Sequence, residues 1–139
     1  MAKQISTHIT IHANLQKVWQ VLTDFDSYPE WNPFIKSLKG EVAEGKIIVA
    51  KIDKMIFKPR VLVFEKEKEF KWLGHLLVKG LFDGEHRFRL AENADGTVHF
   101  EQSEKFKGIL VPLFKKMLDE ETKPGFEAMN RALKARCEA

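Results

Sequence analysis

Apolar and polar positions alternate from residue 4 to residue 12, so that Ile5, Thr7, Ile9 and Ile11 share one side of the chain. A period of two residues is typical of a strand that buries one face and leaves the other in water. The pattern therefore predicts a half-buried strand at the start of the chain.

Two short helices are expected after this strand. Asn14 is a favourable N-cap, and the apolar residues that follow it recur at helical spacing up to about Thr23. Pro29 and Pro33 stop a longer helix in the next stretch, although a proline is well tolerated in the first turn of a short one. We therefore predict an amphipathic helix over residues 15–23 and a brief second helix that starts near Pro29.

Six further segments have the composition of strands and follow one another closely. They span residues 34–43, 46–53, 60–68, 69–77, 81–91 and 97–107. The turn residues between them leave no room for the crossover of about a dozen residues that a parallel pair requires. We therefore expect one curved antiparallel sheet of about seven strands.

After Gly108 the apolar residues recur with a period near 3.6 residues, out to about Arg136. A helix of this length would lie across the whole sheet, and Pro124 and Gly125 should bend it. These elements predict an α+β fold in which the sheet wraps around a long C-terminal helix. Residues 1–139 are expected to form a single domain, because their number is typical of one hydrophobic core.

This order of elements resembles the helix-grip fold of the START-like superfamily, also called SRPBCC. Two stretches carry a local likeness as well. VWQVLTDFDSYPEWNPFI, residues 18–35, resembles the segment after the first strand of that superfamily. FDGEHRFRL and FEQSEKFKGILVPLF, between residues 82 and 114, resemble its polyketide cyclase/dehydrase branch. The resemblance covers essentially the whole chain.

The resemblance implies a pocket for an apolar molecule, because members of the superfamily bind lipids, sterols, quinones, hormones or polyketides. Only some members catalyse a reaction, so the function of this chain depends on its own site residues.

Composition narrows the kinds of partner. The chain has 11 Phe and 3 Trp but 1 Tyr, and aromatic rings without hydroxyl groups suit a dry interior or an apolar ligand. Its net charge of +3 comes from scattered basic residues, which argues against nucleic acid. The sequence contains no P-loop, dinucleotide fingerprint, HExxH or paired-cysteine motif, so we expect no cofactor and no metal.

The sequence gives less information on the location of the protein and on its oligomeric state. The lone Cys137 cannot form an internal disulfide, so it gives no sign of an oxidising compartment. The sequence shows neither a signal peptide nor an apolar stretch of about 18 residues. We therefore expect a cytoplasmic monomer or homodimer without integral membrane association.

Polar residues on inward faces are the main candidates for chemistry. His86 falls on the inward face of strand 81–91, and Gln102 and Glu104 fall on the inward face of strand 97–107. Opposed residues of a hairpin share a face, and the favoured register places His86 opposite Glu104. The imidazole and the carboxylate would then be close enough to form a hydrogen bond.

Three interpretations of this pair stay open. His86 and Glu104 can satisfy each other as structural groups in the core. They can form the polar end of a cavity and orient a hydrophobic or amphipathic ligand, which is our leading hypothesis. They can also be the acid–base pair of a polyketide cyclase, aromatase or dehydratase. A chaperone-type interaction module is a further alternative, and it would need an exposed apolar patch.

The inward side of the sheet mixes large aromatic residues with Gly84 and Ala50, which predicts a cavity of a few hundred Å³. His75 falls on the opposite face of its strand and is expected to be solvated or to lie at the rim of the cavity. Trp31 and the methionines of the long helix suit the core as well as a pocket wall. The expected ligand-contacting residues are Trp31, Trp72, Phe82, His86, Phe88, Phe100, Gln102, Glu104, Phe114, Met117 and Met129.

Overall fold

The computed structural model describes residues 2–76 and 78–139. Its strands are β1 (Ala2–Ile11), β2 (Ile35–Lys39), β3 (Val49–Ile52), β4 (Met55–Phe57), β5 (Arg60–Glu65), β6 (Glu69–His75), β7 (Asp83–Glu92) and β8 (Val98–Lys107). Its α-helices are α1 (Leu15–Thr23), α2 (Tyr28–Trp31), α3 (Lys115–Met117) and α4 (Lys123–Glu138). Two 3₁₀ turns, η1 (Phe25–Ser27) and η2 (Val111–Phe114), and a π-helical segment (Leu118–Thr122) complete the described chain. The predicted end of strand 69–77, at Leu77, lies outside the described residues.

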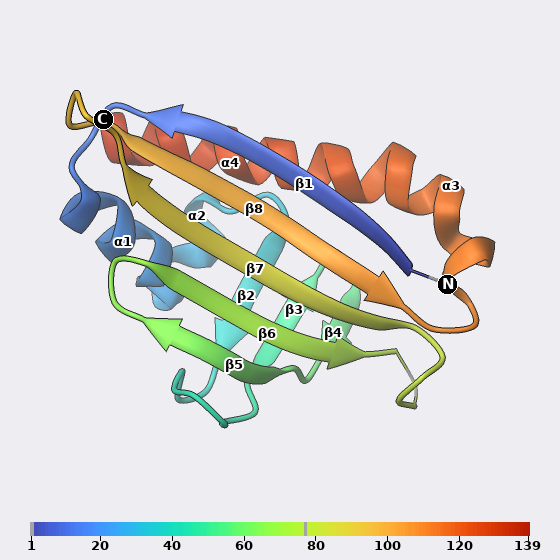
Figure 1. Cartoon of the computed structure of the whole chain (residues 1–139). Coiled ribbons are helices and arrows are strands. Elements are labelled where there is room, and N and C mark those ends of the chain that lie inside the picture. The colour runs from blue at the N-terminus through green and yellow to red at the C-terminus, as the bar shows by residue number, and fades with distance from the viewer. Residues whose placement is uncertain (1, 77) are drawn as a thin grey trace.

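The strands form two antiparallel sheets (Figure 1). Five of them are ordered β1-β8-β7-β6-β5, and the other three are ordered β2-β3-β4. An isolated bridge between Ile47 and Arg60 connects the two sheets. The predicted α+β class and helix-grip arrangement are confirmed. The single sheet of about seven strands is replaced by this division, and β4 was missed because three residues are too few to show an alternation.

The helices after β1 agree with the sequence pattern. The side chain of Asn14 accepts a hydrogen bond from the amide of Lys17 at 2.8 Å and caps α1, which ends at Thr23 as expected. Pro29 lies in the first turn of α2. Together the two helices extend the core on the side of the five-stranded sheet where α4 also lies.

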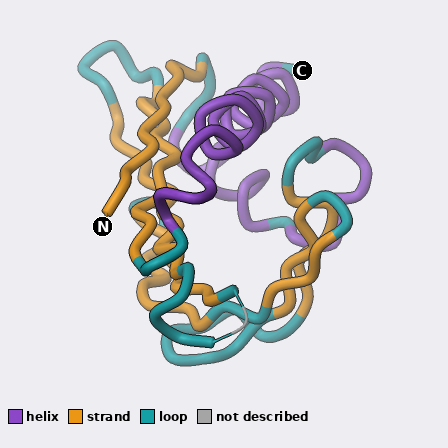
Figure 2. The backbone as a smooth tube through the Cα atoms, turned by 90° about the vertical axis from the view of Figure 1, so that its right-hand side faces the viewer, coloured by secondary structure: helices purple, strands orange, loops and turns teal. Residues whose placement is uncertain are grey.

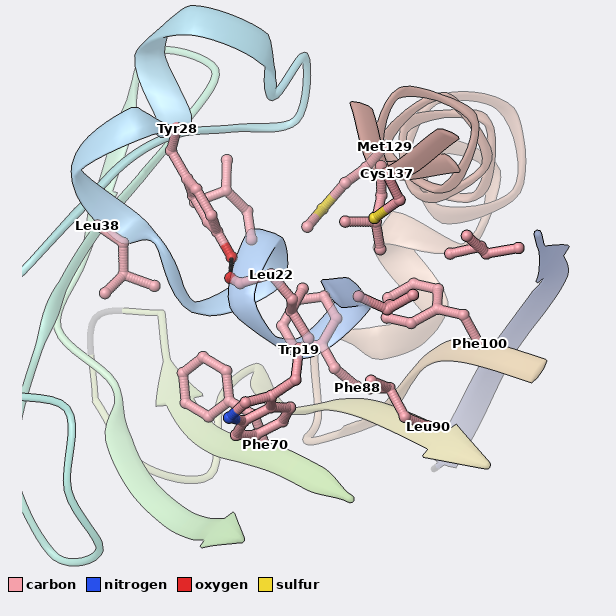
Figure 3. Close-up of a cluster of buried hydrophobic side chains, with 14 of the residues drawn as sticks. Trp19, Leu22, Tyr28, Leu38, Phe70, Phe88, Leu90, Phe100, Met129 and Cys137 are labelled. Carbon is pink, nitrogen blue, oxygen red and sulfur yellow. Dashed lines mark hydrogen bonds between the residues drawn. The ribbon is translucent and has the colours of Figure 1, made fainter. Parts of the chain in front are cut away.

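The long helix α4 runs over the two sheets, which face each other beneath it (Figure 2). The core fills the space between α4, α1 and the sheets (Figure 3). The hydroxyl of the fully buried Tyr28 donates a hydrogen bond to the carbonyl of Leu22, and burial raises the pKa of Tyr28. Burial also raises the pKa of Cys137 to about 11, so this thiol stays protonated and acts as a small apolar group. Among the helices of the described residues, none is long and apolar enough to cross a membrane.

The C-terminal helical run is less regular than its periodicity predicts. Instead of one helix it consists of η2, α3, the π-helical segment and α4. Pro124 has no amide hydrogen to donate to the carbonyl of Glu120, so one α-helical hydrogen bond is missing there. The π-helical segment Leu118–Thr122 lies directly before Lys123 and relieves this mismatch. The expected interruption at Pro124 and Gly125 is not found, because α4 runs from Lys123 through both residues, and the irregular turns lie before them.

Gly125 has a packing role that the sequence did not indicate. A Cβ atom at this position would lie 2.7 Å from Cδ1 of Phe34. The absence of a side chain therefore lets the start of α4 approach the Phe34 ring, which also packs edge-on against Phe126 with ring centroids 5.2 Å apart.

We predict that Gly125→Ala destabilises the protein. In a helix without this contact the substitution would stabilise by about 0.5–1 kcal/mol. Here the overlap with Phe34 should reverse the sign and cost about 1–3 kcal/mol in the free energy of unfolding, measured by urea denaturation. Glu127→Ala, at an exposed position of the same helix, is the control and should change stability little. A Gly125→Ala variant more stable than the parent would contradict this account.

Candidate functional site

A cavity of about 530 Å³ lies between the two sheets. Its walls come from β2, β3 and β4 on one side and from β6, β7 and β8 on the other, and α3 and the π-helical segment border it as well. The volume is within the usual range for small-molecule pockets and agrees with the expected few hundred Å³. The main apolar lining residues are Phe34, Ala50, Ile52, Met55, Phe57, Trp72, Leu76, Phe82, Phe106, Met117 and Leu118.

The residues proposed from the sequence divide into two groups. The structure brings Trp72, Phe82, His86, Glu104 and Met117 to the cavity wall, and it places His75 there as well. The remaining six lie elsewhere. These are Phe88, Phe100 and Met129, which are fully buried in the core; Gln102, which is buried behind His86; Phe114, which packs on Phe82; and Trp31, which borders a separate small pocket.

Several lining residues were missed in the sequence. Phe106 shares the inward face of β8 with Glu104, so the same alternation that singled out Glu104 also identifies it. Met55 and Phe57 belong to the unpredicted strand β4, and Phe34 precedes β2 rather than opening it. For these three residues the local pattern carried no usable signal.

His86 and Glu104 are directly opposed in the pairing of β7 with β8, as predicted. Nδ1 of His86 lies 3.0 Å from Oε1 of Glu104, and Nε2 lies 2.9 Å from Oε1 of Gln102. The imidazole is 1% exposed and the Glu104 side chain 14% exposed. The pair therefore presents its carboxylate end to the cavity and buries its imidazole end.

Aromatic rings hold the imidazole in place. Trp72 stacks on His86 with ring centroids 4.9 Å apart and an interplanar angle of 29°. Phe126 meets it edge-on at 4.9 Å, and Phe34 lies roughly parallel at 6.3 Å. Because rings surround it, His86 has little rotational freedom, and its two nitrogens keep their orientation toward Glu104 and Gln102.

Gly84 makes room for the Glu104 carboxylate. A Cβ atom at Gly84 would collide with Oε2 of Glu104. The glycine lies on β7 two residues before His86, on the same inward face, so the carboxylate lies over its backbone. Within residues 2–76 and 78–139, Oε2 has no hydrogen-bond partner, and this oxygen is therefore available to a ligand.

The hydrogen bonds continue from Gln102 into the core. The side-chain amide of Gln102 donates to Oδ1 of Asn130 at 2.8 Å and to the carbonyl of Phe126 at 3.3 Å. The amide of Asn130 donates to Oγ1 of Thr7 at 2.9 Å, and this hydroxyl donates to the backbone carbonyl of Gln102 at 2.8 Å. Asn130 and Thr7 were not among the predicted site residues, because only the folded chain brings β1 and α4 together behind His86.

Residues 2–138 match the model of a protein family described as polyketide cyclase/dehydrase and lipid transport. The chain belongs to this family. The match confirms the predicted resemblance to polyketide cyclases and dehydrases. No protein of curated function matches the chain by sequence.

Solved structures share the fold. A hypothetical protein from Helicobacter pylori has a TM-score of 0.84 at 16% identity, over 97% of this chain and 88% of its own. A START superfamily protein from Mycobacterium smegmatis has a TM-score of 0.73 at 19% identity, over 97% of both chains. The Zhui aromatase/cyclase from a Streptomyces species has a TM-score of 0.79 at 13% identity, over 99% of this chain and 94% of its own.

We predict that Gly84→Ala separates Glu104 from His86, because the added methyl group occupies the place of Oε2. The ¹⁵N NMR signals of the His86 ring should shift, since Nδ1 loses its partner. Gly74→Ala is a matched control. Gly74 on β6 pairs with Gly84 on β7, and a Cβ atom at Gly74 would meet only Pro59, at 3.7 Å. Unchanged His86 signals in Gly84→Ala would show that the carboxylate does not depend on this glycine.

Proposed function

We propose that the protein binds a hydrophobic or amphipathic small molecule in the cavity between its two sheets. The observation that carries this proposal is the combination of about 530 Å³ of largely apolar space with the hydrogen-bonded His86–Glu104 pair at its wall. The other ionisable lining residues are Lys36, Asp53, His75 and Glu121. Apolar walls contribute affinity by burying ligand surface, and a few fixed polar groups select its orientation. The family description, which includes lipid transport, supports the same class of ligand.

A second candidate function is catalysis of a cyclisation or dehydration on a polyketide-like substrate. It is favoured by the position of the His86–Glu104 pair, which touches the cavity through its carboxylate. The similarity in fold to a protein named aromatase/cyclase is compatible with this function. Ligand binding is the preferred hypothesis, because both functions require a bound ligand. Acid–base catalysis requires in addition that this ligand is a reactive substrate.

A chaperone-type interaction module is the third hypothesis. It would use exposed apolar side chains rather than an internal space. The cavity favours a small molecule, because several of its aromatic walls, including Trp72 and Phe106, are almost fully buried and cannot contact a protein partner.

Filling the cavity should abolish binding. Ala50 is fully buried and lines the cavity, so Ala50→Phe places a ring inside it. We expect this variant to lose binding of Nile red, measured by fluorescence titration. It should also lose any molecule that native mass spectrometry detects on the parent protein purified without detergent. Val49→Phe is the control, because Val49 is the neighbouring residue on the outward face of β3 and is 37% exposed. Equal binding by both variants would exclude the cavity as the site.

Substitution of the polar pair should separate binding from catalysis. Glu104→Gln keeps the size of the side chain but removes its carboxylate. For a binding protein, this variant and His86→Ala should weaken the affinity for the co-purified ligand by the equivalent of about 1–3 kcal/mol. For an enzyme, conversion of that ligand followed by mass spectrometry should slow by about two to four orders of magnitude. Lower melting temperatures with unchanged affinity and no conversion would leave the pair a structural role alone.

A further inference from the structure

His86 is the buried histidine among the five of the chain, and both of its ring nitrogens have hydrogen-bond partners. A neutral imidazole carries one N–H and one lone pair, so the partner of each nitrogen determines where the proton lies. On the Nε2 side the partner is the side-chain amide of Gln102, which can accept through its oxygen or donate through its nitrogen. The orientation of this amide therefore decides the proton position.

A backbone carbonyl fixes the orientation of Gln102. The end of the amide that points away from His86 lies 3.3 Å from the carbonyl oxygen of Phe126. A carbonyl can only accept, so this end must be the NH₂ group. The oxygen of Gln102 is then turned toward His86, where it accepts a hydrogen bond from Nε2–H at 2.9 Å.

A second set of contacts, made by Thr7 and Asn130, gives the same orientation of the Gln102 amide. The hydroxyl of Thr7 donates to the backbone carbonyl of Gln102, which again can only accept. Its oxygen therefore receives the amide hydrogen of Asn130, and the oxygen of Asn130 faces the NH₂ group of Gln102. Thr7, Asn130 and Gln102 thus form a relay, and its two ends agree in placing a proton on Nε2 of His86.

With Nε2 protonated, the contact between Nδ1 and Oε1 of Glu104 holds one shared proton. This proton lies either on Nδ1, beside a carboxylate, or on Oε1, beside a neutral imidazole. In both arrangements the second oxygen, Oε2, carries no proton and faces the cavity as an acceptor. A further proton would leave an uncompensated positive charge among the rings of Trp72 and Phe126, which is costly in an apolar surrounding.

We propose that the relay of Thr7, Asn130 and Gln102 makes Oε2 of Glu104 a permanent hydrogen-bond acceptor, and that the ligand presents a neutral hydroxyl, phenol or enol group to it. A carboxylate or phosphate at this point would set lone pairs against lone pairs, so such anions are disfavoured there. The ligand class is therefore a hydroxylated apolar molecule. This inference rests on the proposed binding function, and its test has one arm that does not depend on binding.

The first arm measures the proton directly. Long-range ¹H–¹⁵N NMR of the ligand-free protein at neutral pH should show a proton on Nε2 of His86. The other four histidines, which are exposed or half-exposed, serve as internal references. An unprotonated Nε2 would overturn the proposal, whatever the protein binds.

The second arm compares probes of similar size that differ in one group: 2-naphthol, 2-methoxynaphthalene and 2-naphthoate. By calorimetric titration 2-naphthol should bind about tenfold more tightly than its methyl ether, the effect of one hydrogen bond to a buried acceptor, and 2-naphthoate should bind most weakly. Glu104→Met should remove the preference for the hydroxyl group. Glu101→Met, the same change on the outward face of β8, should keep it.

The outcomes distinguish a failure of the acceptor inference from a failure of the proposed binding function. Binding of the methyl ether or of 2-naphthoate as tightly as 2-naphthol would overturn the acceptor inference and leave the binding function standing. If none of the three probes bound, the binding function and the ligand class would fail together, and the NMR arm would still support or overturn the position of the proton. A hydroxyl preference that persists in Glu104→Met would also contradict the proposal.

Discussion

Both nitrogens of the buried His86 imidazole need a hydrogen-bond partner, and the elements that supply these partners are held together as a result. A polar group without a partner in an apolar surrounding costs about 1–3 kcal/mol, and a charged one costs more. His86 on β7 meets this requirement with Glu104 and Gln102 on β8, and Gln102 in turn depends on Asn130 in α4 and Thr7 in β1. The relay therefore joins three adjacent strands to the long helix and fixes how α4 lies on the sheet.

The cavity is bordered by residues of two separate core clusters. The core divides into a large cluster around Phe70, Phe88 and Phe100 and a smaller one around Phe106 and Phe126. The His86–Glu104 pair lies where the two clusters meet, since the imidazole contacts Trp72 of the larger cluster and Phe126 of the smaller one. Gly84 leaves room for the Glu104 carboxylate, and Gly125 lets α4 approach Phe34. A side chain at Gly84 would displace Glu104, and one at Gly125 would displace Phe34, and both displaced residues line the cavity.

This arrangement gives the two ends of the pair different properties. The imidazole is enclosed by rings and held by the relay, so its orientation does not depend on a ligand. The carboxylate is 14% exposed and faces the cavity, so it can contact a bound ligand. A preorganised acceptor in a largely apolar pocket is the kind of group that selects a ligand orientation, because its hydrogen bond is made without reorganisation of the protein.

The sequence by itself determined the elements whose signals are local. Alternation along β7 and β8 together with the turn between them favoured the register that places His86 opposite Glu104, and the structure has this register, because hairpin pairing follows from strand period and loop length. The Asn14 cap and Pro29 likewise marked α1 and α2 through contacts within a few residues. Only the tertiary structure decided that Phe88, Phe100 and Met129 fill the core while Phe34, Met55 and Phe57 line the cavity. An inward-facing residue has the same pattern in either case, and the distance to the opposite sheet decides between them. The same limit applies to Thr7 and Asn130, which are 123 residues apart and meet only because α4 packs against β1.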